Sequence, residues 1–282
     1  MNFSRYIILL FSILVLITGT VSCTKEKKER KLPPVRSKPE FTYPGNRPIT
    51  YELDKTYEYK YIEEGNEIGT ASFVISRIEN GNYSIYSTIN FDNPDSGDRI
   101  DGESILILDQ NWHFISYDRE MDSVYGIDST MDGHYSISIE NSGDTITVEN
   151  NTPEFEEPVV QQINIKGDEN ENTLSVDLEK TFLFDNNFIG MMAYICSQPV
   201  MKSGRRELIS VYGVTYNAFI DLALTPKIKK EMDHLGEKVV VYEVDMKSDD
   251  STFGNYYITP DGILIEAEEQ GGFLVIELQT EI

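Results

Sequence analysis

Side chains that bind metals or act as nucleophiles are few in this chain of 282 residues. His113, His134 and His234 lie in separate segments without a zinc-ligand motif around them, and we interpret them as solvated or strand-end histidines. Cys196 stands in an apolar segment without a positive neighbour to activate a thiol, so it is predicted to be a core residue. The glycine motifs of serine hydrolases, phosphate-binding loops and dinucleotide folds are absent. The sequence therefore predicts no metal site, no cofactor and no catalytic residue.

Carboxylates are the abundant reactive groups, with 48 Asp and Glu in the chain. A pair of the kind found in glycosidases is defined by a separation of roughly 5–10 Å in space, which sequence spacing does not supply. The loop 92–98 (DNPDSGD) and Asp101-Gly102-Glu103 offer oxygen ligands to calcium, but Pro94 and the glycine stand at the wrong positions for an EF-hand. An acidic hairpin loop is the alternative interpretation. A carboxylate-based hydrolase stays one of the functions to be considered.

Residues 1–22 have the order of a secretory signal peptide. Arg5 supplies a positive charge, residues 6–17 (YIILLFSILVLI) form an apolar run, and short residues lead up to Cys23. The run is shorter than the about 20 residues that a helix needs to span a bilayer. An uncleaved helix is the alternative, but the basic residues that follow Cys23 would then lie outside the membrane, against the positive-inside rule. Cleavage before Cys23 is the preferred interpretation.

The short residues before Cys23 resemble the lipobox of bacterial lipoproteins, although Thr20 stands where leucine is usual. The resemblance implies that Cys23 becomes the first residue after cleavage and carries acyl chains such as palmitate. Two or three chains anchor a protein stably, at about 0.8 kcal/mol per buried CH₂ group, whereas one chain is marginal. We therefore expect the protein on the extracytoplasmic face of a bacterial membrane, held by lipid on Cys23. Thr24, which is not an aspartate, implies the outer membrane where the organism has two.

The charge of the chain is divided unevenly. Residues 23–48 hold eight Lys and Arg, three Asp and Glu and few apolar residues, so we expect a disordered, proline-rich tether. This tether is either a solvated spacer or a segment that lies against anionic headgroups. Residues 49–282 hold 15 Lys and Arg against 45 Asp and Glu, which disfavours nucleic acid as a partner. Their length suits a single β-rich domain, and lipidation of Cys23 leaves no second thiol for a disulfide.

Alternation with a period of two dominates residues 49–282 and predicts roughly a dozen strands, mostly antiparallel. Residues 83–91 and 135–148 show this alternation well. The turn signals Glu64-Gly65-Asn66, Asn80-Gly81 and 259–262 (TPDG) separate such runs, because their residues tolerate a positive φ or start a tight turn. The segment is therefore predicted to be mainly β.

Two segments have the spacing of helices. In residues 185–199, an Asp-Asn-Asn cap precedes apolar residues on one helical face, and a proline ends the run. In residues 225–236, Pro226 suits a first helical turn and Gly236 a helix end, although a ragged edge strand fits equally. We therefore expect one or two short helices.

The apolar face of the first predicted helix is the candidate ligand site. It carries Phe188, Met191, Met192 and Ile195. Methionines suit adaptable apolar pockets, so these side chains are predicted to line a cavity for an apolar ligand. Plain packing of the helix in the core is the alternative.

The layout of lipobox, tether, meandering strands and a short helix resembles the lipoprotein-carrier (LolA/LolB-like) superfamily of unclosed β-barrels. Ile68-Gly69-Thr70 and residues 257–265 (YITPDGILI) are similar to stretches of its uncharacterised relatives. The resemblance implies a large, strongly curved antiparallel sheet that stays open, with a β-sandwich as the alternative fold. It also implies binding of an acyl chain or a lipoprotein, or a part in envelope assembly. No functional residue is carried over, because no residue-specific motif matches.

Three functions are thus considered. The first is an extracytoplasmic, membrane-anchored lipoprotein that binds an apolar ligand or assists envelope assembly. The second is an acidic scaffold with a filled core that docks a basic partner. The third, an enzyme, is not expected. A cavity lined by apolar residues separates the first from the second.

Overall fold

The computed structural model describes residues 49–126, 132–143, 145–153, 157–164, 181–199, 201–215, 217–248, 252–269 and 274–282. The predicted signal peptide, Cys23 and the tether lie outside these residues. Among the helices of the described part, none is long and apolar enough to cross a membrane.

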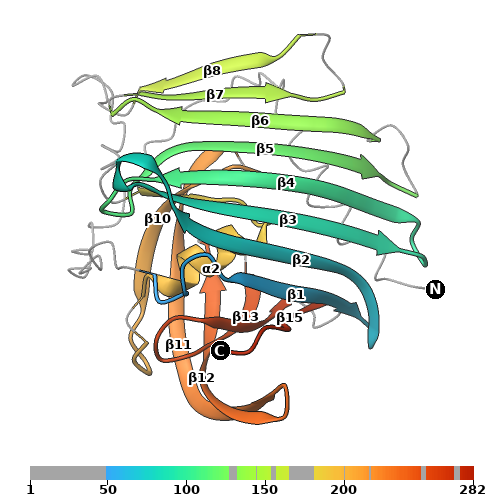
Figure 1. Cartoon of the computed structure of the whole chain (residues 1–282), viewed down its shortest axis with the longest axis vertical. Coiled ribbons are helices and arrows are strands. Elements are labelled where there is room, and N and C mark those ends of the chain that lie inside the picture. Colours follow the sequence, from blue (N-terminus) through green and yellow to red (C-terminus); the bar gives the residue numbers. More distant parts are fainter. Residues whose placement is uncertain are drawn as a thin grey trace, which may run out of the picture. The chain divides into compact units, whose positions relative to one another are not determined.

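The described residues form one large sheet (Figure 1). Its strands are β1 (Thr56–Glu63), β2 (Asn66–Arg77), β3 (Tyr83–Asn93), β4 (Asp98–Leu108), β5 (Phe114–Val124), β6 (Gly133–Asn141), β7 (Thr145–Asn151), β8 (Val159–Asn164), β9 (Thr181–Phe184), β10 (Glu207–Gly213), β11 (Ala218–His234), β12 (Glu237–Lys247), β13 (Thr252–Ile258), β14 (Leu264–Glu269) and β15 (Leu274–Leu278).

The sheet has 15 strands in the order β8-β7-β6-β5-β4-β3-β2-β1-β15-β14-β13-β12-β11-β10-β9. Neighbouring strands are antiparallel except for β9 and β10, which are parallel. Among the described strands, β1 and β15 are the first and last in sequence and meet in the middle, and β8 and β9 are the two ends. Because the two ends do not pair, the barrel-like sheet stays open. The prediction of an unclosed, mainly antiparallel sheet is confirmed, and the sandwich alternative is not.

Tight turns join the strands where the sequence predicts them. Asn80 and Gly81 lie in a single 3₁₀ turn, η2 (Glu79–Gly81), with φ values of 63° and 77° between β2 and β3. Glu64 and Gly65 have φ values of 49° and 83° between β1 and β2. Positive φ at both residues matches the twist of the strands on either side, which explains why these pairs make hairpins. Both predicted turns are confirmed.

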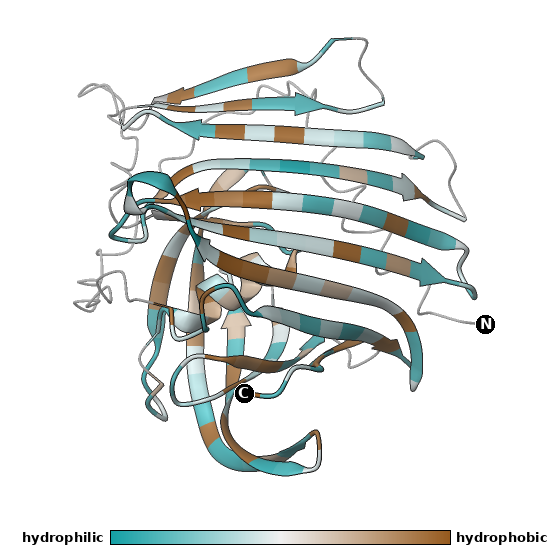
Figure 2. Ribbon diagram, viewed as in Figure 1, coloured by the Kyte–Doolittle hydropathy of each residue, from teal (hydrophilic) through white to brown (hydrophobic). Residues whose placement is uncertain are grey.

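Alternating hydropathy gives the sheet an apolar inner face and a polar outer face. Figure 2 shows hydrophobic and hydrophilic residues alternating along β2 to β6. In β3, Ile85 and Ile89 are buried, whereas Asn90 is exposed. A tyrosine on the inner face can also form a hydrogen bond with its buried hydroxyl. Tyr59 donates such a bond to the Leu264 carbonyl at 2.8 Å. The predicted faces of residues 83–91 are confirmed.

The helix α2 (Ile189–Ser197) lies in the core and confirms the helix predicted within 185–199. Its N-cap is Phe188, which makes no side-chain capping bond, so the predicted Asp or Asn cap is wrong. All nine helical residues are buried, and they pack against β2, β3, β9 and β14. Because these strands come from both halves of the sheet, the sheet bends around the helix (Figure 1).

Gly190 sets the close approach of α2 to β3. A Cβ atom at this position would lie 2.2 Å from Ser87 Oγ and 2.9 Å from Phe73 Cβ, well inside normal contact distance. Only glycine therefore lets the helix lie this near the sheet. Ser87 is buried, and its hydroxyl has no hydrogen-bond partner among the described residues. Little space is left between the helix and this part of the sheet.

The helix predicted for residues 225–236 is wrong, and the strand alternative is confirmed. These residues continue β11, whose register against β12 shifts between Pro226 and Lys229. Proline has no N–H for a ladder bond, so a bulge at this point is expected. The shift places Ile228 in solvent, at 66% exposed, and Leu235 lies in the turn that follows. The spacing that suggests a helical face is thus spread over a bulge and a turn.

Candidate functional site

The predicted ligand-binding residues lie inside the packed core. Phe188 and Ile195 are 0% exposed, Met191 is 1% exposed and Met192 is 6% exposed, all within one hydrophobic cluster. This is the arrangement expected of core packing, the alternative interpretation of these side chains. Their part in ligand binding stays a prediction, as does acylation of Cys23, which lies outside the described residues.

His113, His234 and Cys196 each pack or pair with groups of the fold itself. His113 pairs with Asp109 at 3.1 Å in the turn between β4 and β5. His234, the last residue of β11, is buried and its Nε2 lies 3.0 Å from the Thr280 carbonyl oxygen. Cys196 is 0% exposed in α2, and burial raises the pKa of its thiol. The prediction that Cys196 is a core residue is confirmed.

The loop considered for calcium is a turn organised by its own side chains. Asn93 Oδ1 accepts hydrogen bonds from the N–H groups of Asp95 and Ser96 at 3.0 and 3.3 Å. Asp101 and Glu103 lie beyond this turn, in β4. Within the part of the chain that is described, no three His, Cys, Asp or Glu side chains are grouped as a metal site requires. The segment is thus an acidic hairpin loop, which is the alternative interpretation of its sequence.

A cleft of about 440 Å³ lies on the outer face of the sheet, over β2 to β6. We name it the acidic cleft. The residues that line it are Thr70, Tyr86, Thr88, Ile89, Asn90, Asp101, Gly102, Glu103, Glu120, Met121, Asp122 and His134. None of these is Lys or Arg, and none belongs to α2.

The strand register places like charges opposite one another in the acidic cleft. Asp101 of β4 pairs with Asp122 of β5, and Glu103 pairs with Glu120. Residues two apart in a strand share a face, so the four carboxylates form a compact square. Like charges directly opposite on a sheet are destabilising. The register thus gathers four exposed carboxylates on one face of the sheet.

Polar side chains contact three of these four carboxylates. Asn90 Nδ2 donates to Asp101 at 3.0 Å, and the Tyr86 hydroxyl donates to Glu103 at 2.5 Å. The bond to Glu103 raises the pKa of Tyr86. His134 Nδ1 lies 3.0 Å from Asp122. Carboxylate oxygens of this cluster can also accept hydrogen bonds from ammonium or guanidinium groups.

Sequence analysis missed the acidic cleft, although one signal points to it. The turn Asp109–His113 fixes the hairpin of β4 and β5, because His113 N and Asn111 N both donate to Asp109 Oδ1. A hairpin centred on this turn brings residues 101 and 103 opposite 122 and 120. The motif Asp-Gly-Glu at 101–103 is therefore half of a cross-strand cluster, and the calcium interpretation considered only this half.

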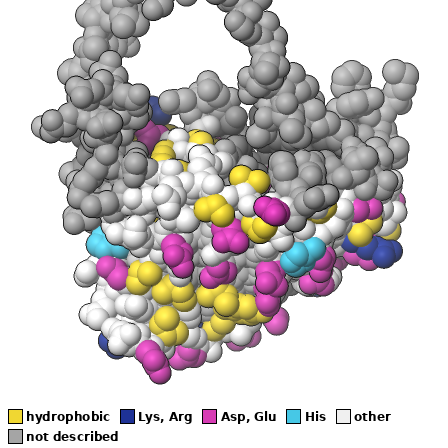
Figure 3. All heavy atoms as spheres, turned by 90° about the horizontal axis from the view of Figure 1, so that it is seen from above, with side chains coloured by type: hydrophobic (Ala, Val, Ile, Leu, Met, Phe, Trp, Pro, Cys, Tyr) yellow, Lys and Arg dark blue, Asp and Glu magenta, His cyan; other side chains and the backbone are white. Residues whose placement is uncertain are grey.

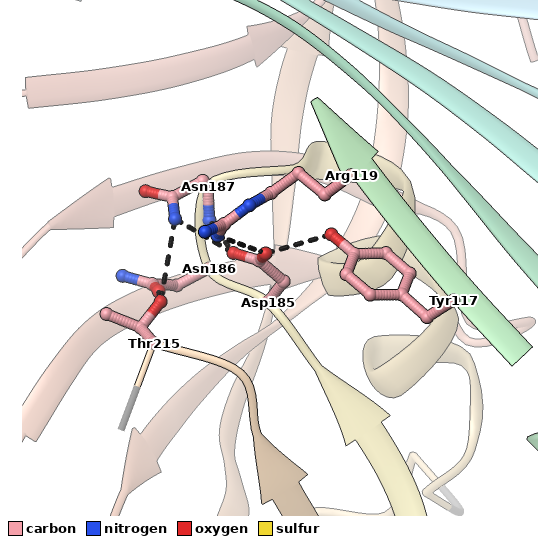
Figure 4. A network of polar contacts seen from close by, with 6 residues as sticks. All are labelled: Tyr117, Arg119, Asp185, Asn186, Asn187 and Thr215. Atoms are coloured by element: carbon pink, nitrogen blue, oxygen red, sulfur yellow. Dashed lines mark hydrogen bonds and ion pairs between the residues drawn. The ribbon is translucent and has the colours of Figure 1, made fainter. Parts of the chain in front are cut away.

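A second polar cluster is buried at the N-terminal end of α2 (Figure 4). Asp185 is 0% exposed, and its Oδ2 accepts hydrogen bonds from the Tyr117 hydroxyl and from Arg119 Nη1, each at 2.8 Å. Its Oδ1 accepts from the N–H and the side-chain amide of Asn187 at 3.0 and 2.9 Å. Because both oxygens are occupied, this carboxylate ties β5 to the β9–α2 connection and is not available to a ligand.

The surface at the β8 end combines acidic and apolar side chains. Figure 3, viewed from above Figure 1, shows hydrophobic side chains interspersed with Asp and Glu, and few Lys or Arg. Val159 and Val160 of β8 are 47% and 59% exposed.

Comparison with known proteins finds similar folds only. No family model and no curated protein matches the chain. A beta-barrel-like protein of the domain of unknown function DUF1849 from Brucella abortus is similar in structure, with a TM-score of 0.47 and 8% identity over 79% of this chain and 92% of that one. A DUF1089 family protein from Pseudomonas aeruginosa has a TM-score of 0.39 and 12% identity over 72% and 90%. Resemblance to the lipoprotein-carrier superfamily stays a prediction.

Proposed function

We propose that this chain is an extracytoplasmic, lipid-anchored lipoprotein that works as an acidic scaffold and binds a Lys- or Arg-rich segment of a partner protein. The observation that carries the proposal is the acidic cleft, in which two like-charged cross-strand pairs face solvent without a Lys or Arg among the lining residues. The packed core around α2 supports recognition at the surface rather than inside the sheet.

The location rests on the sequence of the first 23 residues. A charged start, an apolar run and short residues before Cys23 support export and lipidation. The experiment is labelling with palmitate in a bacterial host. Wild-type protein should be shortened and labelled, and Cys23→Ser should remain a full-length, unlabelled precursor. Normal processing and labelling of Cys23→Ser would remove this part of the proposal.

Recognition is tested with fluorescent hexalysine and anisotropy at low salt. Glu103→Gln/Glu120→Gln should weaken binding by about tenfold, the factor that corresponds to about 1.4 kcal/mol. The control is Glu231→Gln/Glu237→Gln, which removes two exposed carboxylates from the other half of the sheet. An equal loss in both variants would mean that hexalysine responds to net charge and that the cleft is not the site. Binding should also disappear at about 1 M salt, where the Debye length is about 3 Å.

Carriage of an acyl chain or a lipoprotein is the second candidate function. The sheet is open between β8 and β9, and α2 is built from apolar residues that include Met191 and Met192. For an apolar ligand to enter, the helix would have to move away from the sheet. Native mass spectrometry of the protein from its own host tests this candidate. A retained lipid would favour it, and a bare protein would favour the scaffold.

A further inference from the structure

A basic patch interrupts the acidic surface of the domain beside β11. It consists of residues 202–206 (KSGRR), which precede β10, and residues 227–230 (KIKK) of β11. These nine residues hold six of the 15 Lys and Arg in 49–282, and no Asp or Glu. We infer that this patch docks on the anionic headgroups of a bilayer. The inference takes from the proposed function only the lipid anchor, which would keep the domain beside a membrane.

Hydrogen bonds hold the two segments of the basic patch side by side. The Gly204 N–H donates to the Pro226 carbonyl at 2.7 Å, and the Ser203 hydroxyl donates to the Lys227 carbonyl. The first segment thereby continues the alignment of β10 with β11. Three residues of a strand span about 10 Å, which is about one Debye length at 0.1 M salt. The charges of the two segments therefore act on a partner as one positive surface.

Only part of this positive charge is neutralised by neighbouring side chains. Arg205 and Lys227 form ion pairs with acidic side chains of β10 and β12. Lys202, Arg206 and Lys229 are exposed and form no ion pair within the described part of the chain. Each Lys or Arg near an anionic membrane surface raises the binding constant about fivefold. Three such side chains are therefore available to lipid headgroups.

An apolar side chain stands in the middle of the basic patch. Ile228 is 66% exposed, the highest value among the exposed large apolar side chains of the described residues. It lies in the β-bulge that follows Pro226, and a bulge re-aims the side chains it contains. A soluble polyanion offers no contact to such a side chain. A bilayer interface accepts Lys and Arg at its headgroups and an aliphatic side chain below them, so the combination favours a bilayer as the partner.

The acidic cleft lies too far along the sheet to cancel the basic patch. In the strand order, β11 is six strands away from β2, the nearest strand of the cleft. At about 4.8 Å per strand this separation is about 29 Å along the sheet. Exposed charges are largely screened beyond about 8 Å at physiological salt. The patch therefore meets headgroups through its own local field, although the domain as a whole is acidic.

Co-sedimentation with vesicles tests the docking. The protein is the mature chain from Cys23, made without acyl chains so that the anchor does not contribute. The vesicles contain equal parts of phosphatidylglycerol and phosphatidylcholine. The basic residues within 24–48 are the same in every variant, so a difference between variants reports on the patch. Lys202→Gln/Arg206→Gln/Lys229→Gln should weaken binding about 100-fold, because three factors of about five are lost.

The matched control is Lys60→Gln/Arg77→Gln/Arg99→Gln, which removes the same charge from β1, β2 and β4. It should bind nearly as tightly as the wild type, since these side chains lie outside the patch. Equal losses in the two triple variants would mean that binding responds to net charge alone, and the inference would be wrong. Undiminished binding of the patch variant would reject it as well.

Ile228→Ser separates a bilayer from a soluble polyanion as the partner. Loss of one partly inserted aliphatic side chain should weaken vesicle binding about fivefold. Val160→Ser, at a side chain that is 59% exposed on β8, should have no effect. Unchanged vesicle binding of Ile228→Ser, with patch-dependent binding of inorganic polyphosphate, would reject the bilayer in favour of a soluble polyanion. Palmitate labelling of Cys23 tests the anchor separately, so absent labelling with patch-dependent vesicle binding would reject the anchor and keep the docking.

Discussion

The substitution Gly190→Ala tests whether α2 lies as tightly on the sheet as the structure shows. In an exposed helix, replacing glycine by alanine stabilises by about 1 kcal/mol, because glycine loses more backbone entropy on folding. Here the added Cβ would meet Ser87 Oγ at 2.2 Å, Phe73 Cβ at 2.9 Å and Ile85 Cγ2 at 3.0 Å. Overpacking of a core costs typically about 1–3 kcal/mol, so we expect a net loss of stability.

Ser87→Ala provides the matched second change. The Ser87 hydroxyl is the nearest obstacle to the new Cβ and has no hydrogen-bond partner among the described residues. Its removal alone should therefore be close to neutral. The double variant should recover part of the loss, because the contact with Phe73 Cβ remains. Residues in contact are coupled by about 0.5–3 kcal/mol, which sets the scale of the recovery.

Urea unfolding of the wild type, both single variants and the double variant measures these free energies. The single tryptophan, Trp112, is buried against Tyr83 and gives a fluorescence signal alongside circular dichroism. If Gly190→Ala is at least as stable as the wild type, or if the two changes are additive, the reasoning is refuted. The helix would then have room to move away from β3, which is the movement that a carrier requires.

Three further predictions concern the core and the pH response. Met192→Ala should cost about 2–5 kcal/mol in urea unfolding, because it leaves a cavity in the core. The wild type should then show no saturable binding of a fluorescent fatty acid. A small loss of stability together with weakened uptake of this probe would support the carrier function. Arg119→Met should cost about 3–5 kcal/mol, because it leaves Asp185 buried without its ion pair, and Asp185→Asn should cost less; equal losses would contradict this explanation. Burial and two neighbouring glutamates raise the pKa of Glu266, so the folded protein holds this proton more tightly than the unfolded chain. Stability should therefore rise as pH falls from neutral through the folded-state pKa, and Glu266→Gln should reduce that slope in unfolding at a series of pH values.

Most of the sheet could be predicted from the sequence because strand alternation and turns are local signals. The alternation in 83–91 and the turn at Asn80-Gly81 each depend on a few adjacent residues. The helix expected for residues 225–236 is wrong, and the strand alternative right, because a bulge after Pro226 breaks the period of two and leaves a spacing that suits a helix. The pairing of β1 with β15 depends on residues more than 200 positions apart, and no local pattern reports it.

Sequence patterns do not predict the acidic cleft, because it forms only when β4 and β5 pair in one particular register. Asp101 and Asp122 become neighbours only when the hairpin between β4 and β5 is aligned, and a slip of one residue would turn them to the inner face. Arg119 gives a clearer signal in retrospect. It stands between Tyr117 and Met121 on the apolar face of β5, where a cation requires a buried acid. Sequence alone does not identify that acid as Asp185.

The meeting of β1 and β15 in the middle of the sheet has a consequence for folding kinetics. Counted from β9, the described strands follow one another to β15 and then from β1 to β8, so the first and last of them in sequence pair in the centre of the sheet. Pairing Tyr59 with Leu278 closes a loop of about 220 residues, which costs about 3 kcal/mol more in chain entropy than a ten-residue hairpin. A circular permutant with joined ends and a new opening between β8 and β9 would make every antiparallel pair a hairpin of consecutive strands. It should fold faster than the natural chain, in which β1 and β15 must pair across this long loop.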